Sequence, residues 1–186
     1  MGEAVTVGPR RAIWLLMLGV SAGLAGCGGA PVKSLPCPQV EILPGANYLT
    51  RFAGDSEDLT DTEFEAQLSI ANQLCHYKID NDTQKTTINS DLSVQIAASR
   101  GPKNQGNKAD IKYFVALTGP GGSKLMREDF GVEIPLTATN PTAAVVDEPT
   151  VQIPLKKNEN GDYYRIYIYF DVTPKELAYN RRNPKQ

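Results

Sequence analysis

The stretch YYRIYIYFDV, residues 163–172, decides the fold that we expect for this chain of 186 residues. One set of alternate positions is apolar and comprises Tyr164, Ile166, Ile168, Phe170 and Val172. The other set is polar and aromatic and comprises Tyr163, Arg165, Tyr167, Tyr169 and Asp171. Strict alternation of this kind is typical of a β-strand with one buried face. We therefore predict a strand over residues 163–172 with its apolar set in a core.

The same alternation predicts further strands on the N-terminal side, at residues 40–42, 64–70, 88–96, 111–118, 130–137 and 151–155. Turn residues separate these runs, and Asn160-Gly161 is a type I′ hairpin signal. No stretch between the strands carries a helical stripe of apolar residues. The pattern indicates an all-β domain over residues 37–172, an antiparallel immunoglobulin-like or fibronectin-like β-sandwich of about seven strands. A small β-barrel is the alternative.

Two prolines predict where the edges of the sheets lie. Pro135 and Pro154 stand inside the similar strings VEIPL and VQIPL. Because proline cannot donate a hydrogen bond to a neighbouring strand, both strands are expected at sheet edges.

The N-terminal residues 1–26 have the order of a secretory signal, with Arg10 and Arg11 before the apolar stretch 12–26. Leu24-Ala25-Gly26-Cys27 resembles the lipobox of bacterial lipoproteins. The resemblance implies cleavage before Cys27 and acylation of that cysteine, which would anchor the chain to a lipid bilayer. Gly28, in place of an acidic residue, resembles the signal for the outer membrane of a Gram-negative cell, with the domain facing the periplasm. The small residues and prolines of residues 27–36 indicate a flexible tether that spans at most about 30 Å.

Two cysteines remain in the mature chain, Cys37 and Cys75. An even pair in an oxidising compartment predicts a disulfide. The expected geometry is a strand at 40–42 antiparallel to the strand at 64–70, with one cysteine before the first and the other after the second. The alternatives are two free thiols or a metal site with the only histidine, His76.

Composition and motifs favour neither a nucleic-acid partner nor catalysis. The formal net charge is −2, without a basic stripe. His76 is expected at the end of a strand, and no recognised catalytic or nucleotide-binding motif occurs, so we assign no catalytic residue, metal ligand or cofactor. Two acidic clusters, 55–61 and 80–82, are expected as solvated loops, with calcium binding as the alternative.

The polar set of the first strand is the candidate binding face, namely Tyr163, Arg165, Tyr167 and Tyr169. Tyrosine and arginine are enriched where proteins bind partners, because each combines apolar area with a polar end. The alternative is that these tyrosines pack across strands and bind nothing. After this strand, residues 173–186 predict a short helical turn, capped by Thr173 with Pro174 at its first position, and a basic tail.

Several segments resemble a group of small proteobacterial lipoproteins without an assigned activity: LAGC, CPQVEILPGANYLTRF, LTDTEFEAQL, LCHY, ASRGP, YFVAL and TPKELAYNRR. The resemblance covers nearly all of the mature chain and implies no catalytic residue. We therefore expect a membrane-anchored periplasmic lipoprotein that acts as a non-enzymatic binding or structural module, with a protein of the cell envelope as its partner. A periplasmic hydrolase that uses carboxylates of the acidic loops is the alternative.

Overall fold

A computed structural model describes residues 35–185. The predicted signal segment 1–26, Cys27 and most of the tether lie outside the described residues. The strands are β1 (Gln39–Ile42), β2 (Tyr48–Phe52), β3 (Thr62–Ile79), β4 (Thr86–Arg100), β5 (Lys108–Thr118), β6 (Lys124–Pro135), β7 (Thr142–Asp147), β8 (Thr150–Pro154) and β9 (Arg165–Phe170). The helices are the short 3-10 turns η1 (Leu59–Asp61), η2 (Pro120–Gly122) and η3 (Gly161–Tyr163), and α1 (Pro174–Arg182).

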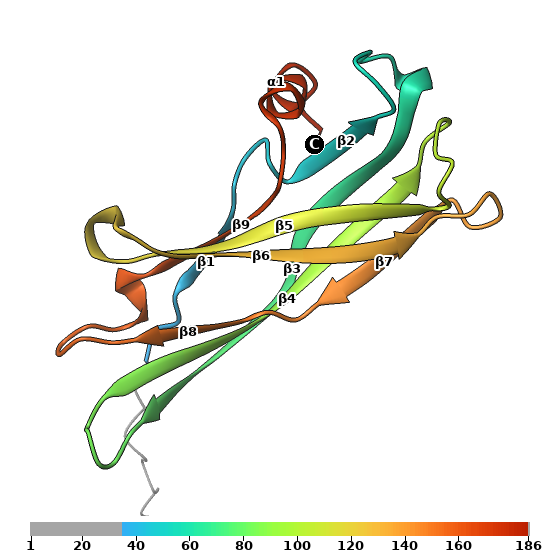
Figure 1. The fold of residues 1–186 in the computed structure, drawn as a ribbon. Helices are drawn as coiled ribbons and strands as arrows, with labels where there is room; N and C mark the ends of the chain where they lie inside the picture. The colour runs from blue at the N-terminus through green and yellow to red at the C-terminus, as the bar shows by residue number, and fades with distance from the viewer. Residues whose placement is uncertain (1–34, 186) are drawn as a thin grey trace, which may run out of the picture. The chain divides into compact units, whose positions relative to one another are not determined.

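These strands form two sheets that pack face to face (Figure 1). The four-stranded sheet has the order β1-β9-β5-β6, and the five-stranded sheet has the order β2-β3-β4-β7, with β8 also paired to β4. The prediction of a β-sandwich is confirmed, and the strands described in residues 35–185 do not close into a barrel. The ladders are antiparallel except for that of β1 with β9. Sequence alternation missed two strands, β2 and β7.

Alternation places the core between the sheets as predicted. In β9, Ile166, Ile168 and Phe170 are fully buried, and Tyr164 just before the strand is 3% exposed. In the opposite sheet, the even positions of β4 from Ile88 to Ala98 point into the same core.

Pro135 and Pro154 end β6 and β8, which are both edge strands, so the expectation about the prolines is also confirmed.

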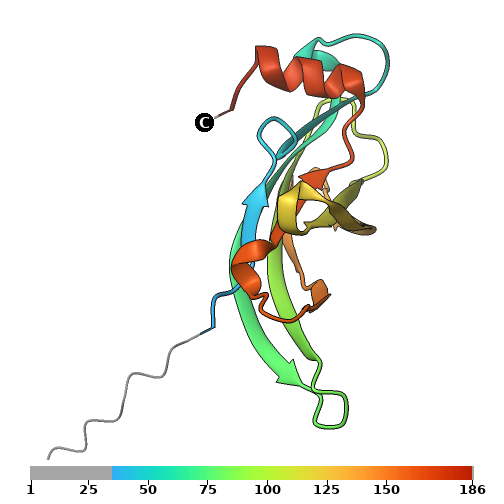
Figure 2. The same ribbon diagram turned by 90° about the vertical axis from the view of Figure 1, so that its left-hand side faces the viewer.

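The strands β3 and β4 form a hairpin that is longer than the rest of the sandwich. Its distal part, residues 72–92, is called the arm below, and Figure 2 shows it at the end of the molecule opposite α1. A register shift between Ile70 and Asn72 marks a β-bulge in β3, which adds one residue on that strand. Inward positions of β3 are therefore even before the bulge and odd after it, so Leu74 is 64% exposed while Cys75 and Tyr77 are partly buried.

A disulfide joins Cys37 to Cys75, with the two Cα atoms 5.9 Å apart, as the cysteine count predicted. The expected geometry was wrong. β1 runs parallel to β9 in the four-stranded sheet, whereas Cys75 lies inside β3 of the other sheet. The bond therefore joins the two sheets, and for a loop of this length the chain-entropy model gives a stabilisation of roughly 4 kcal/mol.

The type I′ hairpin predicted at Asn160-Gly161 is not formed. Both central residues of such a turn need positive φ, but Asn160 has φ −143° and Gly161 is not among the positive-φ glycines. The Asn160 side chain instead accepts a hydrogen bond from the Asp162 amide and caps η3, at 3.0 Å. The segment carries the chain from β8 in one sheet to β9 in the other.

The C-terminal segment forms a longer helix than the single turn that we expected. Thr173 and Glu176 form a capping box, and the last turn of α1 contains Arg181 and Arg182. Asn180 is 7% exposed, and its side-chain amide donates hydrogen bonds to the carbonyl oxygens of Gly45 at 2.7 Å and Tyr48 at 2.8 Å. The basic segment is therefore attached to β2 and the loop before it. Within residues 35–185, no helix has the length and hydrophobicity that a bilayer-spanning segment requires.

Candidate binding face

The outer face of the four-stranded sheet carries the predicted tyrosines. In the register of the sheet, Tyr167 lies between Glu41 of β1 and Ala116 of β5, and Ala116 is next to Arg127 of β6. In the adjacent row, Tyr169 lies beside Phe114 of β5. Side chains from three neighbouring strands thus converge around the middle of this sheet.

Phe114, Arg127, Tyr167 and Tyr169 are called the aromatic face below. The rings of Phe114 and Tyr169 lie with their centroids 5.5 Å apart and their planes tilted by 42°. The guanidinium carbon of Arg127 lies 3.6 Å from the centroid of the Phe114 ring and 5.9 Å from that of Tyr169. This geometry is typical of a cation–π contact, which holds the arginine against the rings while its side chain stays exposed.

A groove of about 430 Å³ borders the aromatic face. Its apolar lining comes from β5, β6, β9 and the residue directly after β1, namely Leu43, Ala116, Leu117, Leu125, Met126, Tyr167 and Tyr169. Leu125 is 53% exposed, although it is a large aliphatic residue. Lys124 and Arg127 lie at the same groove and supply positive charge beside the apolar lining.

The structure separates the residues of the predicted binding face. Tyr167 and Tyr169 lie in β9 and line the groove, whereas Tyr163 belongs to η3 and lies before the strand begins. Arg165 is in β9, but its guanidinium pairs with Glu41 at 2.5 Å and also donates to Gln39. Arg165 therefore links β9 to β1 instead of lining the groove.

Sequence reasoning missed Phe114, Leu125, Met126 and Arg127. The alternation of residues 111–118 places Phe114 and Ala116 on the polar side of their strand, and an aromatic residue there is a usable signal. The position of Arg127 could not be inferred, because it depends on the register of β6 against β5.

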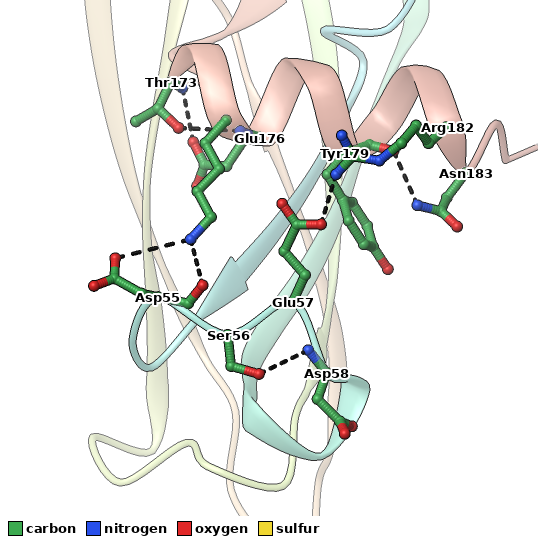
Figure 3. Close-up of polar contacts among 10 residues, drawn as sticks. Asp55, Ser56, Glu57, Asp58, Thr173, Glu176, Tyr179, Arg182 and Asn183 are labelled. Atoms are coloured by element: carbon green, nitrogen blue, oxygen red, sulfur yellow. Dashed lines mark hydrogen bonds and ion pairs between the residues drawn. The ribbon is translucent and has the colours of Figure 1, made fainter.

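The acidic cluster of residues 55–61 begins in an exposed loop, as predicted, and two of its carboxylates pair with α1 (Figure 3). Lys175 lies 3.8 Å from the Asp55 carboxylate, and Arg182 lies 2.6 Å from that of Glu57. Asp58 caps η1 by accepting a hydrogen bond from the Thr60 amide at 2.9 Å, and this bond lowers the pKa of its carboxyl group. The two ion pairs link the exposed loop to the C-terminal helix, and the Asp58 cap orders the loop locally.

The second acidic cluster and His76 lie on the arm. Asp80 accepts hydrogen bonds from the amides of Thr83 and Asp82, which lower its pKa and close the turn between β3 and β4. His76 is exposed, with its Nδ1 3.8 Å from Asp91 Oδ2. Within residues 35–185, no three histidine, cysteine or acidic side chains are grouped in a way that could hold a metal ion.

Comparison with known proteins gives no relative for this chain: no family model, curated protein or solved structure matches it significantly.

Proposed function

We propose that this protein is a non-enzymatic binding module of the cell envelope, anchored by an acylated Cys27 and docking a protein partner on its aromatic face. The observation that carries the proposal is the convergence of Phe114, Arg127, Tyr167 and Tyr169 beside an apolar groove. Rigid rings with a neighbouring arginine are the residue types that dominate binding energy at protein interfaces.

The position of these rings on the sheet favours docking over simple cross-strand packing. Packing explains the contact of Phe114 with Tyr169, but it does not account for the exposed Leu125 at the same groove. The hydrolase alternative has less support, because Glu57 is ion-paired with Arg182 and Asp55 is fully exposed on the loop.

The anchor is supported by the lipobox-like sequence and by the disulfide, which fits an oxidising compartment. Its test is the intact mass of the protein purified from membranes with detergent. We expect an N-terminal Cys27 with the mass of attached acyl chains, and Cys27→Ser should release the protein into the soluble fraction. A native chain with an unmodified N-terminus would refute the anchor.

The binding face is tested by photo-crosslinking in cells of the source organism. A photoreactive phenylalanine derivative at Leu125 should yield a defined adduct, whereas the same probe at Gln95, on the outer face of β4, should not. Introducing Tyr167→Ser with Tyr169→Ser should abolish the adduct at unchanged expression and fold. The matched control is Tyr163→Ser, an exposed tyrosine outside the groove. An adduct that survives the double substitution would refute the aromatic face as the docking site.

A further inference from the structure

The point where the N-terminal chain enters the domain is fixed to the arm by several contacts. The residues 35–38 are called the root. Its Cys37 is joined to Cys75, and its Pro36 carbonyl accepts a hydrogen bond from the Tyr77 hydroxyl at 2.6 Å. The Gly161 amide donates to the same hydroxyl at 2.8 Å, which fixes the tyrosine between the root and η3. The root is therefore held on the inner side of the arm.

A second contact holds the other end of the root. The side-chain amide of Gln73 donates to the Pro38 carbonyl at 2.9 Å and to Ser90 Oγ at 3.1 Å. The order of these contacts gives the direction of the chain. Pro38, Cys37 and Pro36 contact successive inward positions of β3, so the chain, followed toward its N-terminus, runs toward the tip of the arm.

We infer that the tip of the arm, residues 78–86, lies against the headgroup layer of a phospholipid bilayer. The inference depends on the proposed anchor at Cys27 and adds the orientation of the domain to it. Eight peptide links separate Cys27 from Leu35, so the acylated residue lies within about 30 Å of the root at full extension. Beyond Tyr77 the strand continues for only two residues, or about 7 Å, before the turn. The tip thus lies within the length of the tether and on the side toward which the root runs.

The side chains at the tip suit a zwitterionic surface. Ile79 is 58% exposed, and Leu35 of the root is 56% exposed. The tip carries both signs of charge, with Lys78 and Lys85 for phosphates and Asp80 and Asp82 for ammonium groups. Because the charges balance, we expect contact with phosphatidylethanolamine membranes whether or not an anionic lipid is present.

The opposite end of the sandwich would then face away from the membrane. That end contains α1 and the loop 101–107 after β4 (Figure 2). The aromatic face lies along the side of the sandwich between the two ends, where a protein partner has access to it.

The test uses the full acylated protein, purified in detergent and reconstituted into phosphatidylethanolamine vesicles with and without phosphatidylglycerol. Single cysteines carry an environment-sensitive fluorophore in two variants, Asp82→Cys at the tip and Gln105→Cys in the distant loop. Lipids with a quencher on the headgroup should remove most of the emission from the label at 82 and little from the label at 105. Ile79→Asp should reduce the quenching at 82 several-fold while the protein stays bound to vesicles.

The outcomes separate this inference from the proposed anchor. A protein without acyl mass that does not float with vesicles refutes the anchor itself. An acylated, vesicle-bound protein with equal or reversed quenching of the two labels refutes only the orientation. Gly161→Ala, which crowds the root, offers a second perturbation away from the lipid contact. It should reduce the difference in quenching between the labels at positions 82 and 105, whereas Gly54→Ala should leave that difference unchanged.

Discussion

The hydroxyl of Tyr113 in β5 donates a hydrogen bond to Asp147 Oδ2 at the end of β7, with a distance of 2.7 Å. This contact joins the two sheets, and Tyr113 is fully buried with its ring stacked on Phe130 at 5.3 Å. Burial, together with the bond to the carboxylate, raises the pKa of Tyr113 far above its usual value.

Tyr113→Phe removes that bond and keeps the ring, so we expect the free energy of unfolding to fall by about 1–2 kcal/mol. Urea denaturation at neutral pH measures the change. Tyr48 provides the matched control, because its hydroxyl only accepts a 3.3 Å hydrogen bond from the exposed Gln67 side chain. Tyr48→Phe should change stability by less than about 0.5 kcal/mol. Equal effects of the two substitutions would contradict the importance of the contact between the sheets.

The raised pKa of Tyr164 leads us to expect a loss of stability in alkaline solution. Burial and a 2.5 Å hydrogen bond to Glu159 raise the pKa of Tyr164 from about 10 to about 12. Because the folded state retains a proton that the unfolded chain loses, this contribution is complete below about pH 10 and is lost as the pH rises toward about 12. Urea midpoints measured across this window should fall less steeply for Tyr164→Phe than for the wild type. Parallel profiles throughout the window would refute this prediction.

A side chain at position 161 is expected to clash with the root. A Cβ atom at this position would overlap the Pro36 carbonyl oxygen and the Cys37 backbone. Gly161→Ala should therefore cost roughly 1–3 kcal/mol of stability, since neither backbone can move freely beside the disulfide. Gly54→Ala is the control, because a Cβ atom there would have no neighbour within 4 Å. Urea denaturation and the rate of proteolytic cleavage near Pro36 report the two effects, and no difference between the variants would contradict the close approach.

The side-chain hydrogen bonds of Asn180 are expected to hold α1 against β2 and the loop before it. Asn180→Ala leaves the carbonyl groups of Gly45 and Tyr48 without these donors, and we expect a loss of about 1–3 kcal/mol. Amide exchange in α1 should become faster than in the core strands, because the helix separates from β2 locally. Arg181→Ala, at an exposed neighbouring position, should leave exchange unchanged. If exchange in α1 is unaffected by Asn180→Ala, the helix is held by other contacts.

The sequence alone predicted the sandwich but not the path of β3. Its alternation from Phe64 to Ile70 stops at the bulge, and after it the apolar Leu74 points outward while Cys75 points inward. A bulge leaves no distinct mark in a pattern of single residues, so the arm was not foreseen. The length of α1 was underestimated for a related reason, because its buried anchor is the polar Asn180 and not an apolar stripe.

The candidate site was predictable only within one strand. Alternation correctly separated Tyr167 and Tyr169 from the buried face of β9. It could not predict that Arg127 would lie over Phe114, because that contact depends on the pairing of β5 with β6. Nor could it exclude Tyr163 from the strand, since the start of β9 is set by η3.

The bond between Cys37 and Cys75 also determines how the domain responds to mechanical load. Tension applied to the chain ahead of Cys37 passes through a covalent link directly into β3, the longest strand described. The short ladder of β1 with β9 is bypassed, so pulling from the N-terminal side does not peel the sandwich apart from its first strand. Reduction would shift that load onto the hydrogen bonds of the root with Tyr77 and Gln73 and then onto the short ladder of β1, and the resistance of the domain to extension would then depend on its redox state.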